Sequence, residues 1–222
     1  MEKVPPVETQ QANLTRRDRN KLRNRREILD AALEVFAAKG YHQASMQAIA
    51  DRADFAVSTL YALFENKEDL YRKVSAGVGH QCGEIFDTAM ARGGNPYEKL
   101  INFARAKANI WRESPDGIRM LENELHAQMI GNGDPPPNGI AQIYDRFMLR
   151  IEDLFTEGVA DGLFVDRSPA ALAMSLDSST SLLMRKAVQY PDAPPTEEDL
   201  EEIIAIFFDS VLRPPRPLSE SG

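Results

Sequence analysis

Residues 52–71, RADFAVSTLYALFENKEDLY, decide the fold expected for this chain. They predict the end of one helix, a turn of three to four residues, a short helix over 57–63, and the capped start of another helix. A helix of two turns is marginal by itself in water, so its neighbours must hold it in place. Its exposed face carries Ser58, Thr59 and Tyr61, which are small or hydrogen-bonding side chains. This pattern is typical of a helix-turn-helix, whose second helix enters the major groove of DNA.

The composition indicates a globular chain without a membrane or secretion segment. Of its 222 residues, 43% are hydrophobic and 27% are charged, which is enough for one large or two modest domains. No apolar run approaches the ~18 residues of a membrane span, and the polar, then basic N-terminus predicts no signal peptide. A lone cysteine, Cys82, fits a reducing compartment. We therefore expect a cytoplasmic protein with no membrane partner.

Charge is distributed unevenly along the chain. The formal net charge is −8, yet residues 1–75 hold 13 Lys/Arg against 11 Asp/Glu, and residues 76–222 hold 13 against 23. Within 15–26 there are seven basic residues and one acid. A basic run is either a solvated surface or an electrostatic contact for nucleic acid. The helix-turn-helix pattern beside it favours DNA.

Further helix signals lie before and after the opening stretch. An amphipathic helix is expected over about 21–39, closed by Gly40, and a second short helix over about 46–52, capped by Ser45. Asn66 should cap a long helix that ends near Met90. Residues 1–20 are expected to form a flexible basic arm, and 214–222 a disordered tail.

The remainder of the chain predicts five more helices. The breaks are turn-forming runs such as GNGDPPPNG at 131–139. The expected ranges are about 96–113, 114–129, 140–161, 169–189 and 197–212. Because no stretch alternates with a period of two, the expected fold class is all-α, with about nine helices.

These residues resemble the TetR family of transcriptional regulators. The resemblance is carried by REILDAA (26–32), VFAAKGY (35–41), ASMQAIA (44–50), STLYALF (58–64) and ENKEDL (65–70). Beyond this region the similarity is only architectural. The resemblance implies a three-helix DNA-binding domain over 21–70 and an effector-binding and dimerisation domain over 71–213. It also implies a ligand-responsive regulator, expected to be a repressor, that binds a palindromic operator as a homodimer and is released by a small molecule.

The resemblance assigns DNA contacts to a small set of side chains. They are Ser45, Gln47, Val57, Ser58, Thr59, Tyr61 and Lys67. Tyr61 and Lys67 are expected to hold the phosphate backbone together with Ser45 and the free N–H groups that begin its helix. Residues 57–59 should lie in the major groove, and Gln47 either reads adenine or belongs to an ordinary surface.

Three residues depart from the family pattern. Asp54 stands in the turn where the family usually has Gly, although Asp tolerates left-handed backbone. Ala56 stands at the cap of the recognition helix and has no side-chain acceptor, a loss of ~1 kcal/mol. Ser58 replaces a common Gly on the groove face. The operator of a relative therefore cannot be transferred to this chain.

Effector contacts are expected from apolar and aromatic side chains of the C-terminal body. The candidates are Phe103, Trp111, Met120, His126, Met129, Tyr144, Phe147, Met148 and Phe155. The alternative for each is plain core packing. The apolar, Met-rich character favours a hydrophobic or aromatic effector. Glu122 and His126 are four residues apart, but without a third ligand a surface pair is favoured over a metal site.

The last two helices are expected to form the homodimer. Ile204, Phe207, Phe208 and Val211 should be shared between the core and the partner. Such a dimer would present its two recognition helices about 34–36 Å apart, one turn of DNA. No cofactor and no metal are expected. The sequence has no phosphate-binding glycine loop and no Gly-x-Ser-x-Gly motif, so an enzyme is not expected. The alternative function is an α-helical adaptor that binds proteins through the acidic body.

Overall fold

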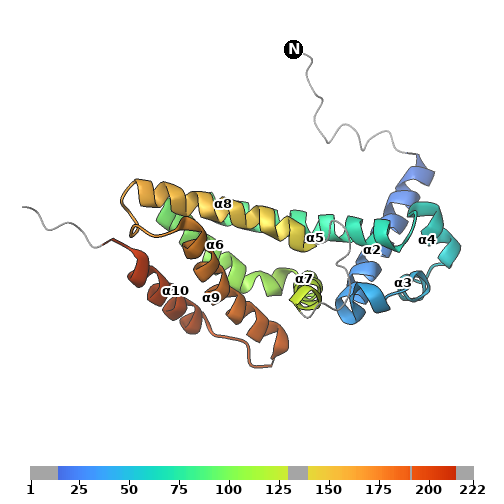
Figure 1. The fold of residues 1–222 in the computed structure, drawn as a ribbon. Helices are drawn as coiled ribbons and strands as arrows, with labels where there is room; N and C mark the ends of the chain where they lie inside the picture. The colour runs from blue at the N-terminus through green and yellow to red at the C-terminus, as the bar shows by residue number, and fades with distance from the viewer. Residues whose placement is uncertain (1–14, 130–139, 191, 214–222) are drawn as a thin grey trace, which may run out of the picture. The chain divides into compact units, whose positions relative to one another are not determined.

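The structure is a computed structural model that describes residues 15–129, 140–190 and 192–213. Within these ranges the chain is all-α, which confirms the expected fold class, and the only β interaction is an isolated bridge between Phe164 and Leu212. The helices of this described part are labelled in Figure 1. They are α2 (Arg16–Gln43), α3 (Met46–Ala53), α4 (Val57–Leu63), α5 (Lys67–Met90), α6 (Pro96–Glu113), α7 (Pro115–Met129), α8 (Ile140–Ala160), α9 (Pro169–Gln189) and α10 (Glu197–Val211). None of them is long and apolar enough to cross a membrane.

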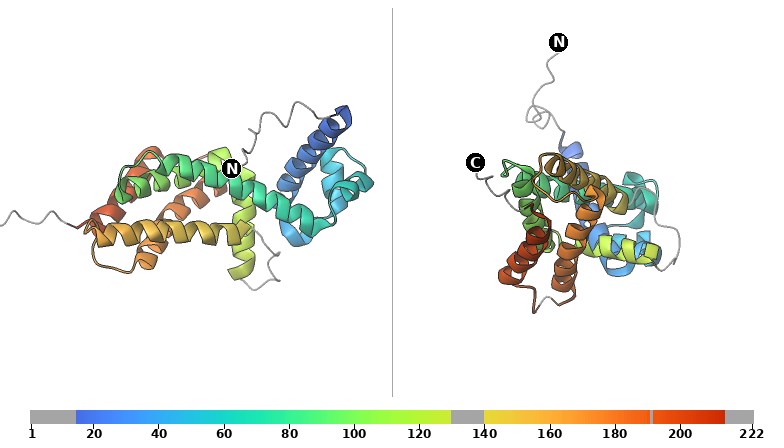
Figure 2. Two further views of the ribbon diagram at one scale, coloured as in Figure 1. Left: turned by 90° about the horizontal axis from the view of Figure 1, so that it is seen from above. Right: turned by 60° about the vertical axis from the view of Figure 1, so that its left-hand side comes forward.

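The chain divides into two compact units, residues 1–74 and residues 75–222. The first unit contains α2, α3, α4 and the first turns of α5. In the second unit α6, α8 and α9 pack against one another, and α10 packs against α9 and α6 (Figure 2). The backbone of α5 is continuous through the boundary between the two units.

Helix α2 begins earlier than the sequence pattern indicated. Its cap is Thr15, whose hydroxyl accepts a hydrogen bond from the Asp18 backbone N–H at 3.2 Å, while the Asp18 carboxylate accepts from the Thr15 N–H at 3.2 Å. This reciprocal capping box begins a helix at Arg16. The expectation that residues 16–20 belong to a flexible arm was therefore wrong, because an Asp in place of the usual Glu concealed the box. Residues 1–14 and 214–222 lie outside the described residues.

The helix-turn-helix backbone has the features that its residues predict. Gly40 interrupts α2 with φ +71°, a conformation that glycine adopts without strain, so it closes the regular part of that helix as expected. Asp54 ends α3 in the left-handed region at φ 58° and ψ 43°. Ala56 precedes α4 without a side-chain cap. Asn66 begins α5, with its side chain accepting from the Asp69 N–H at 2.8 Å.

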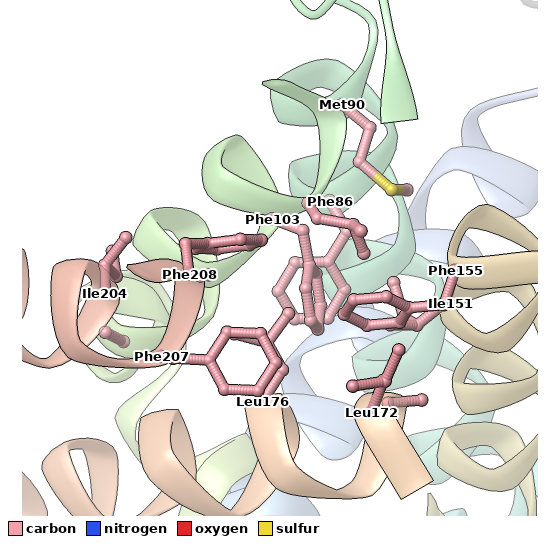
Figure 3. Packing of buried hydrophobic residues seen from close by; sticks show 14 of the residues in the cluster. Phe86, Met90, Phe103, Ile151, Phe155, Leu172, Leu176, Ile204, Phe207 and Phe208 are labelled. Atoms are coloured by element: carbon pink, nitrogen blue, oxygen red, sulfur yellow. The ribbon is translucent and has the colours of Figure 1, made fainter. Parts of the chain in front are cut away.

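The core of the second unit is built from aromatic and branched side chains (Figure 3). Phe86 and Phe103 meet edge to face with ring centroids 5.2 Å apart, and Phe207 and Phe208 meet in the same way at 5.0 Å. Such pairs add to the free energy gained by burial of apolar area. The core therefore joins α5 and α6 to the C-terminal α10.

The side chains expected at the dimer face lie in this core. Ile204, Phe207, Phe208 and Val211 are each less than 9% exposed within the single chain. Within the single chain these four side chains already contact the core, and their sharing with a partner stays a prediction. An apolar stripe as wide as that of α10 can serve two contacts, since Ile206 on the same helix is 65% exposed. Large exposed apolar side chains on α9 and α10 are Met174, Leu182, Tyr190 (just past the end of α9) and Ile206.

Candidate functional site

The start of α3 presents an anion-binding arrangement on the first unit. Ser45 is exposed, and its hydroxyl accepts from the Ala48 N–H at 3.1 Å. The N–H groups of Met46 and Gln47, in the first turn, have no partner in the helix by its geometry. Together with the positive end of the helix dipole, they suit a phosphate oxygen.

Gln47 lies on the exposed surface of α3. Its Nε2 donates to Asp51 Oδ1 of the same helix at 2.7 Å. This contact joins two exposed side chains, so its net contribution to stability is small. Gln47 can therefore exchange Asp51 for another acceptor, such as a base edge, at little cost.

Helix α4 turns one side to the core and the other to solvent. Leu60 is fully buried, while Ser58 is exposed and Tyr61 retains 55% of its surface. Val57 and Thr59 are half-buried at the edge of this face. The structure thus leaves Ser58 and Tyr61 as the most open side chains of the predicted groove face.

Two cations of the first unit bond to its backbone, and one of them holds this short helix. Arg25 donates from Nη1 to the Leu63 carbonyl at 3.3 Å, and its guanidinium lies 4.8 Å from the centroid of the Phe64 ring. Phe64 is itself only 2% exposed. Arg25 therefore caps the C-terminal end of α4, where a cation also complements the helix dipole.

Lys67 is the second internally engaged cation. Its Nζ donates to the carbonyls of Tyr41 at 2.9 Å and Ala44 at 3.0 Å, and it lies 4.5 Å from the centroid of the Tyr41 ring. Partial burial lowers the pKa of this lysine. The ammonium ties the start of α5 to the turn that leads into Ser45 and α3. Sequence reasoning treated Lys67 as a free phosphate anchor and did not foresee this positioning contact.

Asp69 fixes the first turns of α5. It is only 4% exposed and accepts hydrogen bonds from the Glu65 N–H at 3.3 Å, from Arg72 Nη2 at 2.5 Å and from the Lys73 ammonium. The hydrogen bond from Lys73, followed by that from Arg72, holds the pKa of this carboxyl below its usual value. The carboxylate is therefore ionised and paired, and it belongs to the framework beneath the exposed face.

The basic run lies on the surface of α2. Arg16, Arg19, Arg23 and Arg26 are exposed and are spaced by three, four and three residues, which places them along one side of the helix. Arg23 also faces Glu27 at 3.6 Å. The run thus forms an exposed basic stripe, which we define as these four arginines.

A cavity of about 460 Å³ opens in the second unit. Residues of α5, α6, α7, α8 and α9 line it. Its apolar wall consists of Phe86, Ile110, Ile118, Leu121, Ile143, Phe147 and Met184. This volume is in the range of sites that hold small organic molecules.

Of the predicted effector residues whose side chains the structure describes, Tyr144 and Phe147 line this cavity. Phe103, Phe155 and Met120 are buried at 0–2% exposure and are not in the lining, and Trp111 and Met148 pack against the core. Helical periodicity identifies an inward face without separating a cavity wall from solid core, so these five stay predictions as effector contacts. His126 and Met129 belong to α7, but their side chains lie outside the described residues.

A buried lysine lies at the centre of the polar part of the lining. Lys107 on α6 is 2% exposed, and its Nζ donates to Tyr144 Oη at 3.0 Å, to Ser181 Oγ at 2.8 Å and to the Asp177 carbonyl at 3.0 Å. It also pairs with the Asp177 carboxylate, to which the Tyr144 hydroxyl donates. Burial lowers the pKa of Lys107, and the charge of Asp177 opposes that shift. We call these four side chains the Lys107 cluster; it connects α6, α8 and α9.

The Lys107 cluster was missed although a signal was present. Lys107 is three residues from Ala104 and lies on the inward side of its helix, where a lysine needs a buried partner. Its partners Asp177 and Ser181 are four residues apart on one face of α9 but about 70 residues away in sequence. No local pattern could identify them.

Three arginines complete the lining. Arg150 donates to Asp87 at 2.6 Å, and Arg185 lies 3.5 Å from Glu122. Arg146 has no ion-pair or hydrogen-bond partner within the described ranges. Glu122 is thus the partner of Arg185, and no group of three potential metal ligands occurs among the described residues.

Cys82 contributes a thiol to the cavity wall from α5. Its burial raises its pKa to about 11. The group is therefore a neutral thiol near pH 7 and acts as a small apolar surface.

Comparison with known proteins gives matches over both parts of the chain. Residues 28–74 match the family model described as "Bacterial regulatory proteins, tetR family". The HTH-type transcriptional repressor KstR of Mycolicibacterium smegmatis is 39% identical over 38% of this chain and 41% of its own length. KstR of Mycobacterium tuberculosis is 36% identical over 50% of this chain and 60% of its own length. The chain thus spans between two fifths and three fifths of these relatives.

A solved structure extends the likeness of fold. The crystal structure of AibR in complex with isovaleryl coenzyme A and operator DNA superposes with a TM-score of 0.69. The match covers 83% of this chain and 98% of that chain at 21% identity. At this identity the likeness concerns the fold alone.

Proposed function

We propose that this chain is a DNA-binding transcriptional regulator of the TetR type, a repressor whose affinity for DNA responds to a small molecule; the match of residues 28–74 to the family model supports this proposal. The observation that carries the proposal is the helix-turn-helix of the first unit. Its second helix buries Leu60 and leaves Ser58 and Tyr61 open. The names of the curated relatives support the assignment as a repressor.

The proposed DNA contacts divide into positioning and reading. Ser45 and the first N–H groups of α3 bind a phosphate, and Tyr61 binds the backbone beside the groove. Val57, Ser58 and Thr59 face base edges, where a methyl group of Val57 or Thr59 can meet a thymine methyl. Gln47 reads a base after leaving Asp51. Lys67 adds positive charge but acts mainly by positioning α3.

The basic stripe on α2 is proposed to add sequence-independent affinity. Its arginines would neutralise phosphates and release counterions, which makes binding fall as salt rises. Replacing Arg16 and Arg19 with glutamine should lower the salt slope by roughly one for each phosphate that is no longer neutralised. An unchanged slope would remove the stripe from the interface.

The effector is proposed to bind in the cavity of the second unit. The AibR complex, which has a similar fold and contains both a small molecule and operator DNA, supports this division of roles. A ligand that binds one conformation better shifts the population toward it. We propose α5 as the coupling element, because its backbone belongs to the helix-turn-helix unit and also supplies Cys82 and Phe86 to the cavity wall.

We also propose that the regulator is a homodimer formed through α9 and α10. Met174 and Leu182 lie eight residues apart on α9 and are 67% and 62% exposed, and Ile206 on α10 is 65% exposed. Such apolar side chains are typical of the centre of an interface rather than its rim. The expected stoichiometry is two chains on one palindrome. Sedimentation equilibrium of the wild-type chain and of Leu182→Glu with Ile206→Glu tests this expectation.

The experiment that tests the proposed function is selection from a library of random DNA duplexes with the full chain. We expect enrichment of a palindrome whose affinity falls steeply between 50 and 200 mM salt, by about 10³-fold or more for six or more phosphate contacts. Enrichment of no sequence, together with no salt-dependent binding, would instead favour the α-helical adaptor. A pull-down through the acidic second unit would then be the next experiment.

A further inference from the structure

We propose that the cavity selects an organic anion, with its apolar body along the Phe86–Phe147 wall and its anionic group at Arg146 and Arg185. The inference rests on the proposed function in taking the cavity as the effector site. It goes further in naming the chemical class of the effector and the residues that recognise it. It also departs from the plain hydrophobic or aromatic effector expected from the sequence.

The charge of the cavity lining is opposite to that of the body around it. Residues 76–222 contain 13 Lys/Arg and 23 Asp/Glu, so the body as a whole is acidic. The described lining, in contrast, has four cations (Lys107, Arg146, Arg150 and Arg185) and two acids (Glu122 and Asp177). A concave, partly apolar site focuses the field of such charges. A positive site in a negative body favours an anion.

The four cations of the lining differ in how firmly their own chain already binds them. Lys107 is saturated by Tyr144, Asp177 and Ser181, so it serves the framework. Arg150 is held by Asp87 at 2.6 Å. Arg146 has no partner in the described part of the chain, and Arg185 is 3.5 Å from Glu122, longer than a good hydrogen bond. Arg146 and Arg185 are therefore the two that can accept a new partner.

Helix α8 carries two of the lining arginines on one face. Arg146 and Arg150 are four residues apart, so two positive side chains lie on one face of the helix. Asp87 compensates the charge of Arg150, whereas the charge of Arg146 has no such partner among the described residues. An anion beside Arg146 would supply it. Guanidinium also binds carboxylate, sulfonate and phosphate oxygens in pairs, which gives direction as well as affinity.

The opposite wall provides room for the apolar body. Gly83 on α5 lines the cavity, and a Cβ atom built there meets no heavy atom within 4 Å. Gly77, on the same helix, is exposed, is not part of the lining, and is equally free of neighbours. A larger residue at position 83 therefore fills the cavity, while the same residue at position 77 is a matched control.

A pair of fluorescent probes tests the inference on the full chain. 1-Anilinonaphthalene-8-sulfonate carries an anion on an aromatic body, and N-phenyl-1-naphthylamine has the same body without charge. We expect the wild-type chain to bind the sulfonate roughly tenfold more tightly than the neutral probe, as for two charge-assisted contacts. Gly83→Leu should abolish the cavity-bound signal of both probes, while Gly77→Leu should retain it.

Charge variants separate anion recognition from apolar binding. Arg146→Gln with Arg185→Gln should reduce the preference for the sulfonate to about one while leaving the neutral probe unchanged. Arg119→Gln, a change at an exposed arginine of α7 outside the lining, should alter neither. Displacement by decanoate and by decanoyl coenzyme A, with decanol as the neutral control, distinguishes a carboxylate from a phosphate-bearing carrier as the source of the anion.

Two outcomes would overturn the inference. One is a charge preference that survives the double arginine change or is absent from the wild-type chain. The other is probe binding that Gly83→Leu does not reduce relative to Gly77→Leu. Neither measurement uses DNA, so failure here leaves the proposed DNA-binding function intact. Conversely, a chain that selects no DNA but passes these tests would retain its anion site.

Discussion

The two units of this chain use internally bonded lysines in opposite ways. In the first unit Lys67 donates hydrogen bonds to backbone carbonyls, so a cation satisfies the acceptors of the turn that leads into α3. In the second unit Lys107 pairs with a carboxylate, a phenol and a serine from two other helices. The first contact serves an exposed surface whose side chains are left free. The second provides a fixed polar wall for a cavity, beside which Arg146 has no partner among the described residues and Arg185 is held only loosely by Glu122 at 3.5 Å.

This contrast indicates where function can be changed without loss of the fold. In the first unit the residues proposed to touch DNA contribute little to stability, apart from Lys67 and the helix cap Ser45. In the second unit the cluster at the cavity carries a large load, and the arginines around it carry little. Substitutions at each kind of position should therefore separate stability from binding.

The largest effect is expected at Lys107. Lys107→Met removes the partner of Asp177 in a buried site, and breaking a buried pair costs about 3–5 kcal/mol. The loss should appear as a lower midpoint of urea denaturation for the second unit. Lys107→Met with Asp177→Leu should recover part of it, because no unpaired charge remains. Equal stability of the single variant and the wild type would show that the Lys107 cluster is not a structural tie.

A smaller effect is expected at Gly79, where α5 and α8 approach closely. A Cβ atom at this position would lie 2.6 Å from Ile143 Cγ2, so Gly79→Ala requires a shift of the packed side chain. Overpacking of this kind costs about 1–3 kcal/mol. Gly77→Ala, with open space around it, should stabilise the helix by about 0.5–1 kcal/mol. Thermal denaturation of the two variants compares them, and changes of the same sign would contradict the close approach.

In the first unit, Lys67 and Tyr61 should behave differently. Lys67→Met removes hydrogen bonds from two carbonyls and should lower the stability of the helix-turn-helix by about 1–3 kcal/mol. Tyr61→Ala removes an exposed ring and should change stability by less than about 0.5 kcal/mol. Hydrogen exchange of the α3 and α4 amides measures both. Faster exchange in the tyrosine variant alone would reverse the assigned roles.

The smallest effect concerns the two helix caps. Ser45→Ala removes the hydroxyl that accepts from Ala48 and should cost ~1 kcal/mol, whereas Ala56→Ser supplies a missing cap to α4 and should gain about 0.5–1 kcal/mol. Denaturant midpoints are sufficient to compare them. A loss of stability in Ala56→Ser would mean that the approach to α4 has no place for a capping hydroxyl.

The sequence predicted the first unit well because its signals are local. Gly40, Ser45, Asp54 and Asn66 each act on the backbone within a few residues, and each has the geometry that its chemistry favours. The early start of α2 was missed at a capping box of the same local kind. In this box Asp18 occupies the N3 position, where Glu or Gln is more common.

The cavity could not be predicted in the same way. Its wall combines Gly83, Lys107, Arg146 and Asp177 from four helices, and nothing in the sequence near any one of them identifies the others. Periodicity did indicate which faces turn inward, and so Tyr144 and Phe147 were found. It could not show that Phe103 and Phe155 belong to the packed core, whereas Tyr144 and Phe147 border the cavity.

The most direct test of the central claim is the affinity of Tyr61→Ala for the palindrome enriched by the wild-type chain, measured by fluorescence anisotropy. We expect a loss of affinity of roughly tenfold or more, because a hydrogen bond and the packing of a ring at the DNA backbone are removed. The denaturation midpoint of the same preparation should be unchanged. Equal affinity of the variant and the wild type, with both chains folded, would contradict the assignment of the α4 surface to DNA.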